Sequence, residues 1–338
     1  MVGRRLDKLL NGRRTVIRDV DLARPHSMVV FSDMHKGAGD PADEFLPCKP
    51  AYCRALRHYR DAGFTLVLLG DAEDLWEQDF PSIERQHKDV LALEGSFPKE
   101  RHIRVYGNHD LIWKKPNAVR RFLKPYLPAG LVAEAVRLNV WMRREPIGTL
   151  FLLHGHQGTW DADRFYAVSW ITVRLFWKPL QNWFGVGKET PAENACLRGK
   201  YDHRMYAWAS RKSRLILIAG HTHRPVWSSR THLQKLEEEY HSLVQDTGSD
   251  RSQQKDRLEA LRAEIDVRRL AYPPCNDTVK PKPCYFNTGC CKFRDGDVTG
   301  IEIVDGELRL VKWPAGGHPG RRTVLERGAL LDFFKSLS

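Results

Sequence analysis

Five short, mainly apolar segments recur along the first two thirds of the chain, and polar residues follow each of them at once. Apolar runs of this length, bounded by turn residues, are typical of buried β-strands. Residues 50–62 instead have the pattern of a helix, which we expect to end at Gly63 in the C-cap region. Alternating strands and helices predict βαβ units and an α/β fold. The predicted strands cover residues 28–31, 64–69, 103–106, 150–153 and 215–219.

Polar residues of the types that bind metal ions follow these predicted strands. After the second strand, Gly70 turns the chain, and Asp71, Glu73 and Asp74 form an acidic cluster. Buried carboxylates cost stability unless a positive charge faces them, and taken alone the cluster favours an ordinary helix N-terminus. Because all five strands end in this way, and because sites in open α/β sheets lie at the carboxyl ends of strands, the set indicates a metal site. The candidate ligands are Asp33, His35, Asp71, Asn108, His154, His221 and His223.

An aromatic-rich segment, residues 160–212, holds half of the ten tryptophans of the chain. Within it, residues 165–177 are apolar almost all round, but a helix of that length, rising about 1.5 Å per residue, is too short to cross a membrane. We expect an inserted helical cap. Its aromatic residues either form the core of the cap or offer an apolar surface to an acyl chain or a membrane.

A second insertion, residues 228–270, has apolar residues at steps of three and four on either side of a polar turn. This spacing predicts a helical hairpin with a coiled-coil seam. Its many charges form either a solvated face or a docking arm for a partner or nucleic acid. The residues of the seam are Leu233, Leu236, Tyr240, Leu243, Leu258, Leu261 and Ile265.

The two ends of the chain have weaker patterns. Residues 1–25 read as a polar, basic lead-in with one short strand, and residues 322–337 as a last helix. Asp305-Gly306 is a hairpin turn signal in the C-terminal part. Further strands are predicted at residues 137–142, 283–288, 299–304 and 308–313.

The composition fits one folded domain over residues 1–338, since 42% of the residues are hydrophobic and 28% are charged. No apolar run reaches the roughly 18 residues that span a bilayer, and the basic N-terminus has no apolar signal region, so we expect a cytoplasmic protein. Cys290 and Cys291 are expected to be small core residues. The net charge of +12 favours anionic partners, such as phosphates, nucleic acids or anionic lipid surfaces.

The candidate ligands comprise seven nitrogen and oxygen donors and no thiolate. A catalytic zinc ion usually takes only three protein ligands and a water molecule, so the set is too large for one ion. Two divalent ions that share one carboxylate fit it better, and such pairs, about 3.5 to 4 Å apart, serve phosphoryl displacement. Mixed nitrogen and oxygen donors suit manganese, iron or zinc, and suit calcium poorly. Manganese is the expected ion.

Five motifs in the sequence, FSDMHKG, GDAEDLWE, GNHD, HGH and GHTH, closely resemble those of the calcineurin-like metallophosphoesterases, and they occur in the same order. The match covers roughly residues 29–223, and YFNTG at residues 285–289 resembles the closing strand of that family. The resemblance implies an αββα sandwich of two sheets, here with the helical cap and the helical hairpin as insertions.

The same resemblance implies the role of each candidate ligand. One metal ion would be held by Asp33, His35, Asp71 and His223. The other would be held by Asp71, Asn108, His154 and His221, with Asp71 bridging the two. His109 would stand beside the leaving group as a catalytic residue, oriented by Asp110.

The sequence FLLHGHQ at residues 151–157, together with GHTHRP and NTG, is similar to the bacterial UDP-2,3-diacylglucosamine pyrophosphohydrolases, whose helical cap holds acyl chains. The chain departs from that branch in three places. It has His109 where those enzymes commonly carry arginine, HGH where they tend to have HGD, and the additional hairpin. These departures concern the substrate and leave the dimetal site intact.

We therefore interpret the sequence as a dimetal phosphoesterase that hydrolyses a phosphodiester, pyrophosphate or phosphomonoester of a nucleotide- or lipid-linked substrate. If the substrate is lipid-linked, we expect the protein to contact the inner face of the membrane. Two alternatives are also enzymes: a nuclease, which the charge of +12 favours, and a phosphoprotein phosphatase. A non-catalytic scaffold that uses the hairpin is the alternative from another class, but a degenerate scaffold is expected to lose ligands and none is missing here.

Overall fold

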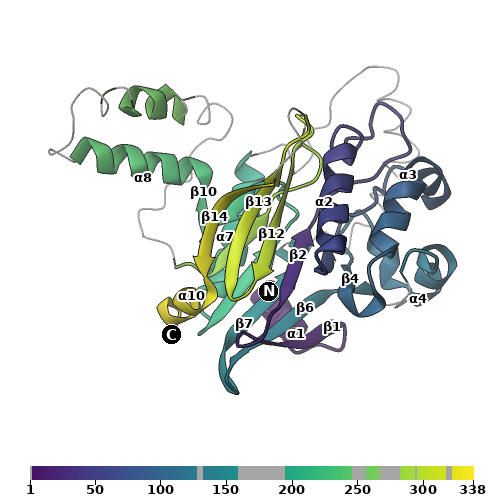
Figure 1. The fold of residues 1–338 in the computed structure, drawn as a ribbon, viewed down its shortest axis with the longest axis horizontal. Helices are drawn as coiled ribbons and strands as arrows, with labels where there is room; N and C mark the ends of the chain where they lie inside the picture. Colours follow the sequence, from purple (N-terminus) through teal and green to yellow (C-terminus); the bar gives the residue numbers. More distant parts are fainter. Residues whose placement is uncertain are drawn as a thin grey trace.

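Two seven-stranded β-sheets form the centre of the molecule (Figure 1). The computed structural model describes residues 2–127, 132–158, 195–245, 255, 257–263, 265–266, 282–293, 295–316 and 322–338. The first sheet has the order β1 (Thr15–Asp21), β6 (Ala135–Met142), β7 (Glu145–Leu153), β8 (Leu215–Ala219), β11 (Tyr285–Thr288), β9 (Pro225–Trp227) and β10 (Arg230–Thr231). The second has the order β14 (Thr323–Ala329), β13 (Glu307–Trp313), β12 (Val298–Val304), β2 (Ser27–Phe31), β3 (Thr65–Leu69), β4 (His102–Val105) and β5 (Val132–Ala133).

Within each sheet, the strands that lead into the candidate ligands run parallel to one another. In the second sheet, β2, β3, β4 and β5 are parallel. In the first sheet, β7, β8 and β11 are parallel. Parallel strands end at the same edge of a sheet, so the loops that follow them lie together. The five strands predicted from the apolar pattern are confirmed as β2, β3, β4, the end of β7, and β8.

The alternation of side chains along β2 and β3 divides the core into two layers. Val30 and Val67 are fully buried between the sheets, together with residues of β7 and β8. Phe31 and Leu68, one position further on, are buried on the other side with residues of α2 (Lys49–Asp61). Because both faces are covered, these strands are apolar throughout, as is typical of parallel strands.

Helices cover the outer faces of both sheets, and the predicted αββα sandwich is therefore confirmed. Beside the second sheet lie α2 and α3 (Phe80–Gly95), as Figure 1 shows. Against the first sheet pack α1 (Val2–Leu10), α7 (Ala195–Ala209) and α10 (Leu330–Ser336). The shorter helical segments are η1 (Lys99–Arg101), η2 (Leu111–Lys114), α4 (Pro116–Ala118), η3 (Val119–Leu123) and η4 (His156–Gly158).

Two predictions at the ends of the chain are only partly confirmed, by β1 and by α10. Residues 1–25 contain α1 as well as β1, because Leu6 and Leu9 form a short apolar face that is buried in the core. Residues 322–337 are not one helix, because Thr323–Ala329 pairs with β13 as the strand β14 and only α10 is helical. Hydrogen bonds to a neighbouring strand decide this conformation, and local propensity does not show them. Gly63, by contrast, follows α2 with a φ of 75°, as a C-cap glycine should.

The second predicted insertion contains α8 (His232–Gln245), which stands away from the two sheets in Figure 1. Residues 257–263 are also helical, and Leu261 and Ile265 are buried against Tyr240 and Leu243. These contacts support a helical hairpin within residues 228–270. Most of the predicted cap, residues 159–194, lies outside the described residues, so the division of residues 1–338 into one domain with two insertions stays a prediction. Among the described helices, none combines the length and the apolar character needed to cross a membrane.

Candidate metal centre

Hydrogen bonds join the loops that follow the parallel strands. In the second sheet, the N–H of Asp33 donates to the carbonyl oxygen of Gly70 at 3.1 Å. In the first sheet, the N–H of Gly220 donates to the carbonyl oxygen of His154 at 2.9 Å. Between the sheets, Nδ1 of His154 donates to the carbonyl oxygen of Leu69 at 2.9 Å. These bonds bring loops from both sheets to one place.

Five of the candidate ligands adopt a left-handed backbone conformation, which residues other than glycine rarely adopt. Each such residue costs on the order of 1–3 kcal/mol and persists only where its surroundings hold it. Backbone strain of this kind is common at functional sites, and here it occurs at residues whose side chains are candidate metal ligands. The φ angles are 55° at Asp33, 49° at His35, 50° at Asp71, 70° at His221 and 54° at His223.

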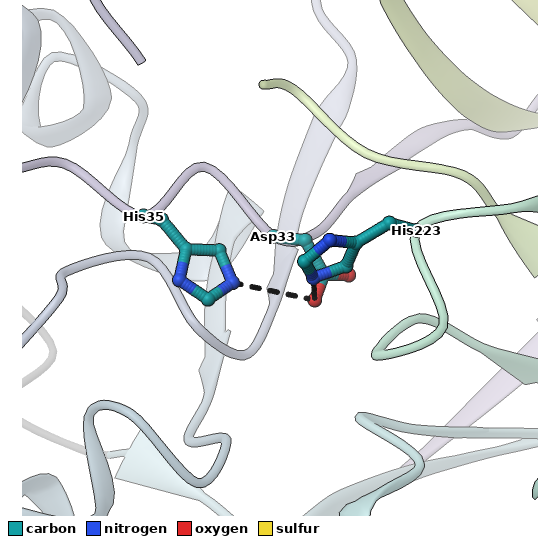
Figure 2. Close-up of side chains that lie close together, drawn as sticks. All are labelled: Asp33, His35 and His223. Atoms are coloured by element: carbon teal, nitrogen blue, oxygen red, sulfur yellow. Dashed lines mark ion pairs between the residues drawn. The ribbon is translucent and has the colours of Figure 1, made fainter. Parts of the chain in front are cut away.

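Asp33, His35 and His223 form one group that could hold a metal ion, with their ligand atoms within 4.8 Å of one another. Figure 2 shows the three side chains pointing toward one another. Oδ1 of Asp33 lies 3.1 Å from Nε2 of His223 and 3.8 Å from Nε2 of His35. Oδ2 of Asp33 accepts the N–H of His221 at 2.9 Å and the hydroxyl of Ser32. The carboxylate is thus held through one oxygen and presents the other to two imidazoles.

Asp71, His154 and His221 form a second such group, and a third, His35, Asp71 and His109, shares one residue with each of these two. Nε2 of His154 lies 3.0 Å from Oδ2 of Asp71 and 3.2 Å from Oδ1 of Asn108. Because Nδ1 of His154 donates to a backbone carbonyl, Nε2 faces these oxygens with a lone pair unless it takes up a second proton. Burial lowers the pKa of His154, but the carboxylates of Asp71 and Asp33 outweigh burial and raise the pKa to about 9. The group therefore attracts a cation.

Asp71 lies between the two groups. Its Oδ2 is 3.0 Å from Nε2 of His154 in the second group and 3.6 Å from Nε2 of His35 in the first. Its Oδ1 accepts the N–H of His109 at 2.8 Å. A Cβ atom at Gly107 would lie 2.1 Å from this Oδ1, so the backbone approaches the carboxylate more closely than another residue would allow. This position supports the predicted bridging role of Asp71.

Several ligand atoms are buried without a hydrogen-bond partner. They are Oδ1 of Asp33, Nε2 of His35 and Nδ1 of His221. An unsatisfied buried polar group costs about 1–3 kcal/mol, and a bound cation would satisfy all three. The donor set combines imidazole nitrogens with carboxylate and amide oxygens, which suits manganese, iron or zinc. The residues present therefore fit divalent metal ions.

The sequence model of the calcineurin-like phosphoesterase family matches residues 26–225. This stretch is more than half of the chain and contains every candidate ligand. The chain belongs to the calcineurin-like phosphoesterase family. This phosphoesterase is therefore a metal-dependent hydrolase of phosphoric esters, as the motifs predicted. Its nearness to the diacylglucosamine branch stays a prediction.

Comparisons with curated proteins and with solved structures do not narrow the function further. No protein with a curated description matches the chain significantly. One matching solved structure is a conserved uncharacterized protein, a predicted phosphoesterase, from Streptococcus pneumoniae TIGR4, and the match covers 89% of this chain and 98% of that chain. The two chains are 11% identical with a TM-score of 0.32, so this likeness does not bear on the site.

His109 of the phosphoesterase lies beside the first ligand group, with its ring centroid 4.4 Å from that of His35. Its Nδ1 is 2.9 Å from Oδ1 of Asp74, and its ring stacks on Trp76 with centroids 4.2 Å apart and planes 19° from parallel. Burial lowers the pKa of His109, but Asp74 and Asp71 outweigh burial and raise the pKa above its ordinary value. His109 is thus an imidazole held in one orientation and inclined to keep its proton.

The prediction that Asp110 orients His109 is wrong. Asp110 is fully buried, and its carboxylate accepts the N–H of Gly107 at 2.6 Å and the N–H of Ala72 at 3.0 Å. It therefore joins the loops after β3 and β4. Neighbouring residues in a turn direct their side chains differently, so adjacency in the sequence does not imply contact. Burial and the charge of Asp71 raise the pKa of Asp110 to about 7.

Lys292 is a further charged residue of the site. Only 14% of its side chain is exposed, and it forms an ion pair with Glu44. The N–H of Cys291 donates to the carbonyl oxygen of Asp33 at 3.3 Å, which fixes the residue before Lys292 to a ligand loop. Burial is the main cause of the lowered pKa of His35, and the charge of Lys292 is the next. An ammonium group therefore lies close to the ligands of the phosphoesterase.

Sequence reasoning missed three residues of the site. Asp74 stands out in the sequence only as part of an acidic cluster, although its position three residues after Asp71 is a usable signal. Trp76 follows in the same motif, where a tryptophan is more often a core residue. Lys292 carried no signal, because a single lysine beyond the motifs does not stand out in a chain with 54 lysines and arginines.

A buried network of charges supports the ligand loops of the phosphoesterase. Nζ of Lys36 lies 2.7 Å from Oε1 of Glu94 and 3.2 Å from Oε1 of Glu73. Arg104 also pairs with Glu73, which in addition accepts the indole N–H of Trp113 at 2.9 Å. Each of the four charged side chains is at most 2% exposed. Lys36 follows the ligand His35, and Glu73 lies two residues after the ligand Asp71. The network therefore fixes the backbone that carries these two ligands.

Proposed function

We propose that this phosphoesterase uses two divalent metal ions to hydrolyse a phosphodiester or pyrophosphate bond in a nucleotide- or lipid-linked substrate. The observation that carries the proposal is the pair of ligand groups that meet at Asp71, each with a buried ligand atom left without a partner. Two cations, one in each group, would satisfy these atoms. In-line displacement at phosphorus is the chemistry that paired divalent ions serve in proteins.

We propose that the ligands divide between the two ions as the family resemblance implies. One ion would be held by Asp33, His35, Asp71 and His223, and the other by Asp71, Asn108, His154 and His221. Bound there, the ions would polarise the phosphoryl oxygens and make water a stronger nucleophile at neutral pH. Manganese is the proposed metal, and iron and zinc accept the same ligands.

His109 is proposed as the proton donor to the leaving oxygen. Its Nδ1 is engaged by Asp74, so a proton on the free Nε2 is the one available for transfer. Asp74 and Asp71 favour the protonated ring, and stacking on Trp76 limits its rotation. A positioned general acid of this kind is typically worth about 10²- to 10⁴-fold in rate.

Lys292 is proposed to bind a phosphoryl oxygen of the substrate. Its ammonium group is nearly buried and paired with Glu44, an arrangement that holds the charge in place. A fixed charge in a poorly solvated site stabilises developing negative charge more than a mobile one, because no reorganisation is needed during the reaction.

The identity of the organic part of the substrate rests on the sequence. The tryptophan-rich residues 160–212 support a substrate with an apolar part, such as an acyl chain, and contact with the inner membrane face. Cytoplasmic location belongs to the same proposal. A soluble nucleotide is the other substrate class, since the chain is basic overall.

Metal analysis and turnover test the proposal together. Purified protein should contain about two equivalents of divalent metal and should hydrolyse bis(p-nitrophenyl) phosphate, with the highest activity on reloading with manganese. Asp71→Asn should weaken both sites and remove nearly all turnover. Asp332→Asn is a matched control, because that carboxylate is 75% exposed on α10. Full metal occupancy with unchanged activity in Asp71→Asn would contradict the proposal.

A substrate panel then separates the classes. Nucleotides, nucleotide-linked pyrophosphates with and without acyl chains, single-stranded oligonucleotides and a phosphopeptide should be compared by kcat/KM. Preference for the oligonucleotides or for the phosphopeptide would favour a nuclease or a phosphoprotein phosphatase instead. A metal-loaded protein without turnover on any ester would favour a scaffold.

A further inference from the structure

A cavity lined by positive charges lies outside the two ligand groups, and we refer to it as the basic cavity. Its volume is about 840 Å³, and four of its seven lining residues are basic while none is acidic. All four basic side chains are exposed, so a ligand can reach them. The lining residues are Arg14, Lys114, Lys115, Pro116, Asn117, Ala118 and Arg120.

The sheet topology places one wall of the basic cavity at the edge that carries the metal ligands. Arg14 precedes β1, which begins with Thr15 opposite Ala135 of β6. Ala135 in turn lies opposite Leu153, the residue before the ligand His154. Neighbouring strands are about 4.8 Å apart, so the backbone of Arg14 lies two strands, or roughly 10 Å, from the end of β7.

The other wall follows directly from a motif of the site. Lys114 ends η2, which begins one residue after Asp110, and Lys115 comes next. Trp113 anchors this segment, because its side chain is 1% exposed and its indole N–H donates to Glu73 at 2.9 Å. The backbone of the two lysines is therefore held in place, five and six residues after His109 in the sequence.

Among the residues that the structure describes, no carboxylate forms an ion pair with a basic side chain of the cavity. Glu134, whose N–H donates to the carbonyl oxygen of Arg14, is buried, and its carboxylate lies 3.7 Å from Arg5. Arg120 donates to the amide oxygen of Asn117, which carries no charge. Like charges gathered in a concave site repel one another and attract anions.

We propose that the basic cavity binds a further phosphate group of the substrate, beyond the phosphodiester or pyrophosphate group that is hydrolysed. This inference rests on the proposed function for the metal centre. A volume within the range of about 300–1,000 Å³ is typical of small-molecule sites. It favours a small, multiply phosphorylated molecule over a nucleic-acid strand or a membrane, which need a longer basic surface. The substrate then spans from the metal ligands to Arg14 and the two lysines.

Charge reversal at the two lysines tests this inference. The variant is K114E/K115E, and the matched control is R327E/K335E, which changes the charge equally. Arg327 and Lys335 lie at the edge of the sheets opposite to the metal ligands. The strand β14 ends at Ala329, two residues after Arg327. The N–H of Arg214, the residue before β8, donates to the carbonyl oxygen of Leu337, two residues after Lys335. Both are exposed.

Two measurements are made on the full chain. Calorimetry measures the binding of inorganic triphosphate without divalent ions. Kinetics of the metal-loaded protein compare diadenosine diphosphate with diadenosine tetraphosphate, which offer the same type of bond but differ in phosphate number. K114E/K115E should weaken triphosphate binding at least tenfold, and should reduce kcat/KM for the tetraphosphate at least tenfold more than for the diphosphate. R327E/K335E should do neither.

Other outcomes overturn the inference. Unchanged triphosphate binding in K114E/K115E, or equal losses in both double variants, would show that the cavity does not recognise phosphate. If triphosphate fails to bind while K114E/K115E loses affinity for a 20-nucleotide single strand or for phosphatidylserine vesicles, the cavity serves one of those partners instead. Failure of the wild type to hydrolyse any ester would count against the proposed function, and triphosphate binding would still decide the role of the cavity.

Discussion

The Asp74 carboxylate lies 2.9 Å from Nδ1 of His109, whereas Asp110, the neighbour of His109 in the sequence, accepts two backbone N–H groups. One acidic residue therefore faces the proposed proton donor, and the other holds the loops together. The two carboxylates can be neutralised separately, and the two changes should have different effects.

His109→Ala should lower the rate about 10²- to 10⁴-fold while both metal ions remain bound, because it removes a proton donor and no proposed ligand. The loss should shrink as the leaving group becomes more acidic, since a good leaving group needs no proton. Rates on a series of aryl phosphodiesters, with metal content measured in parallel, provide the test. An equal loss across the series would mean that His109 only supports the metal centre.

Asp74→Asn should move the pH profile of the reaction. Asp74 raises the pKa of His109, so a protonated His109 is present at low pH and is lost as pH rises through that pKa. Without the carboxylate the pKa falls, and the descending limb of kcat against pH should shift to lower pH. Asp110→Asn should leave that limb in place and lower the melting temperature. A profile unchanged by Asp74→Asn would refute the pairing.

Removal of the metal ions should destabilise the protein. Metal binding to the folded state stabilises it by RT ln(1 + [M]/Kd), about 2.7 kcal/mol at a concentration one hundred times Kd. Chelation should therefore lower the melting temperature by a few degrees, and manganese should restore it. The Asp71→Asn variant is the control, and its melting temperature should respond little to manganese. If chelation does not change the melting temperature of the wild type, the proposed metal centre is contradicted.

The apolar pattern predicted the site-bearing strands because burial on both faces makes them apolar throughout, as Val30 and Phe31 show. The candidate ligands followed from the same pattern, since parallel strands bring their carboxyl ends together whatever the details of packing. Their left-handed backbone, as at Asp33 and His221, is not predictable from residue type, because most Asp and His residues have a negative φ even though they adopt this conformation more often than other non-glycine residues.

Contacts between distant segments account for the rest. The strand β14 depends on hydrogen bonds to β13, and Lys292 belongs to the site only because Cys291 is bonded to the loop of Asp33. Neither relationship leaves a local pattern. The role that the resemblance implies for Asp110 is wrong, because side-chain direction in the turn, which adjacency to His109 does not give, decides which carboxylate meets the imidazole.

Glu73→Gln should destabilise the fold by about 3–5 kcal/mol, because it leaves Arg104 buried with an uncharged partner. Burial raises the pKa of Glu73, but Arg104 and Lys36 outweigh burial and lower it to about 2 from an ordinary 4.5. Because folding lowers this pKa, the ionised Glu73 carboxylate stabilises the folded state above pH 4.5, and this stabilisation is lost as pH falls toward 2.

Chemical denaturation at several pH values measures this contribution. The stability difference between wild type and Glu73→Gln should therefore shrink across that acid range. Glu100→Gln is the control, since its side chain is 65% exposed and its effect should stay within about 0.5 kcal/mol. A difference that does not depend on pH would mean that the charge of Glu73 contributes nothing.

Lys292→Ala should lower kcat/KM about 10- to 100-fold with the metal content unchanged, because a hydrogen bond to a charged group is worth about 1.5–3 kcal/mol. Lys292→Arg should retain most of the activity, since it keeps the positive charge. Glu44→Ala removes the partner of Lys292 without removing the ammonium group, and its carboxylate is 54% exposed, so its effect should be smaller than that of Lys292→Ala. If Lys292→Arg loses as much as Lys292→Ala, or if both variants lose metal, then Lys292 supports the loop of Asp33 and does not bind the phosphoryl group.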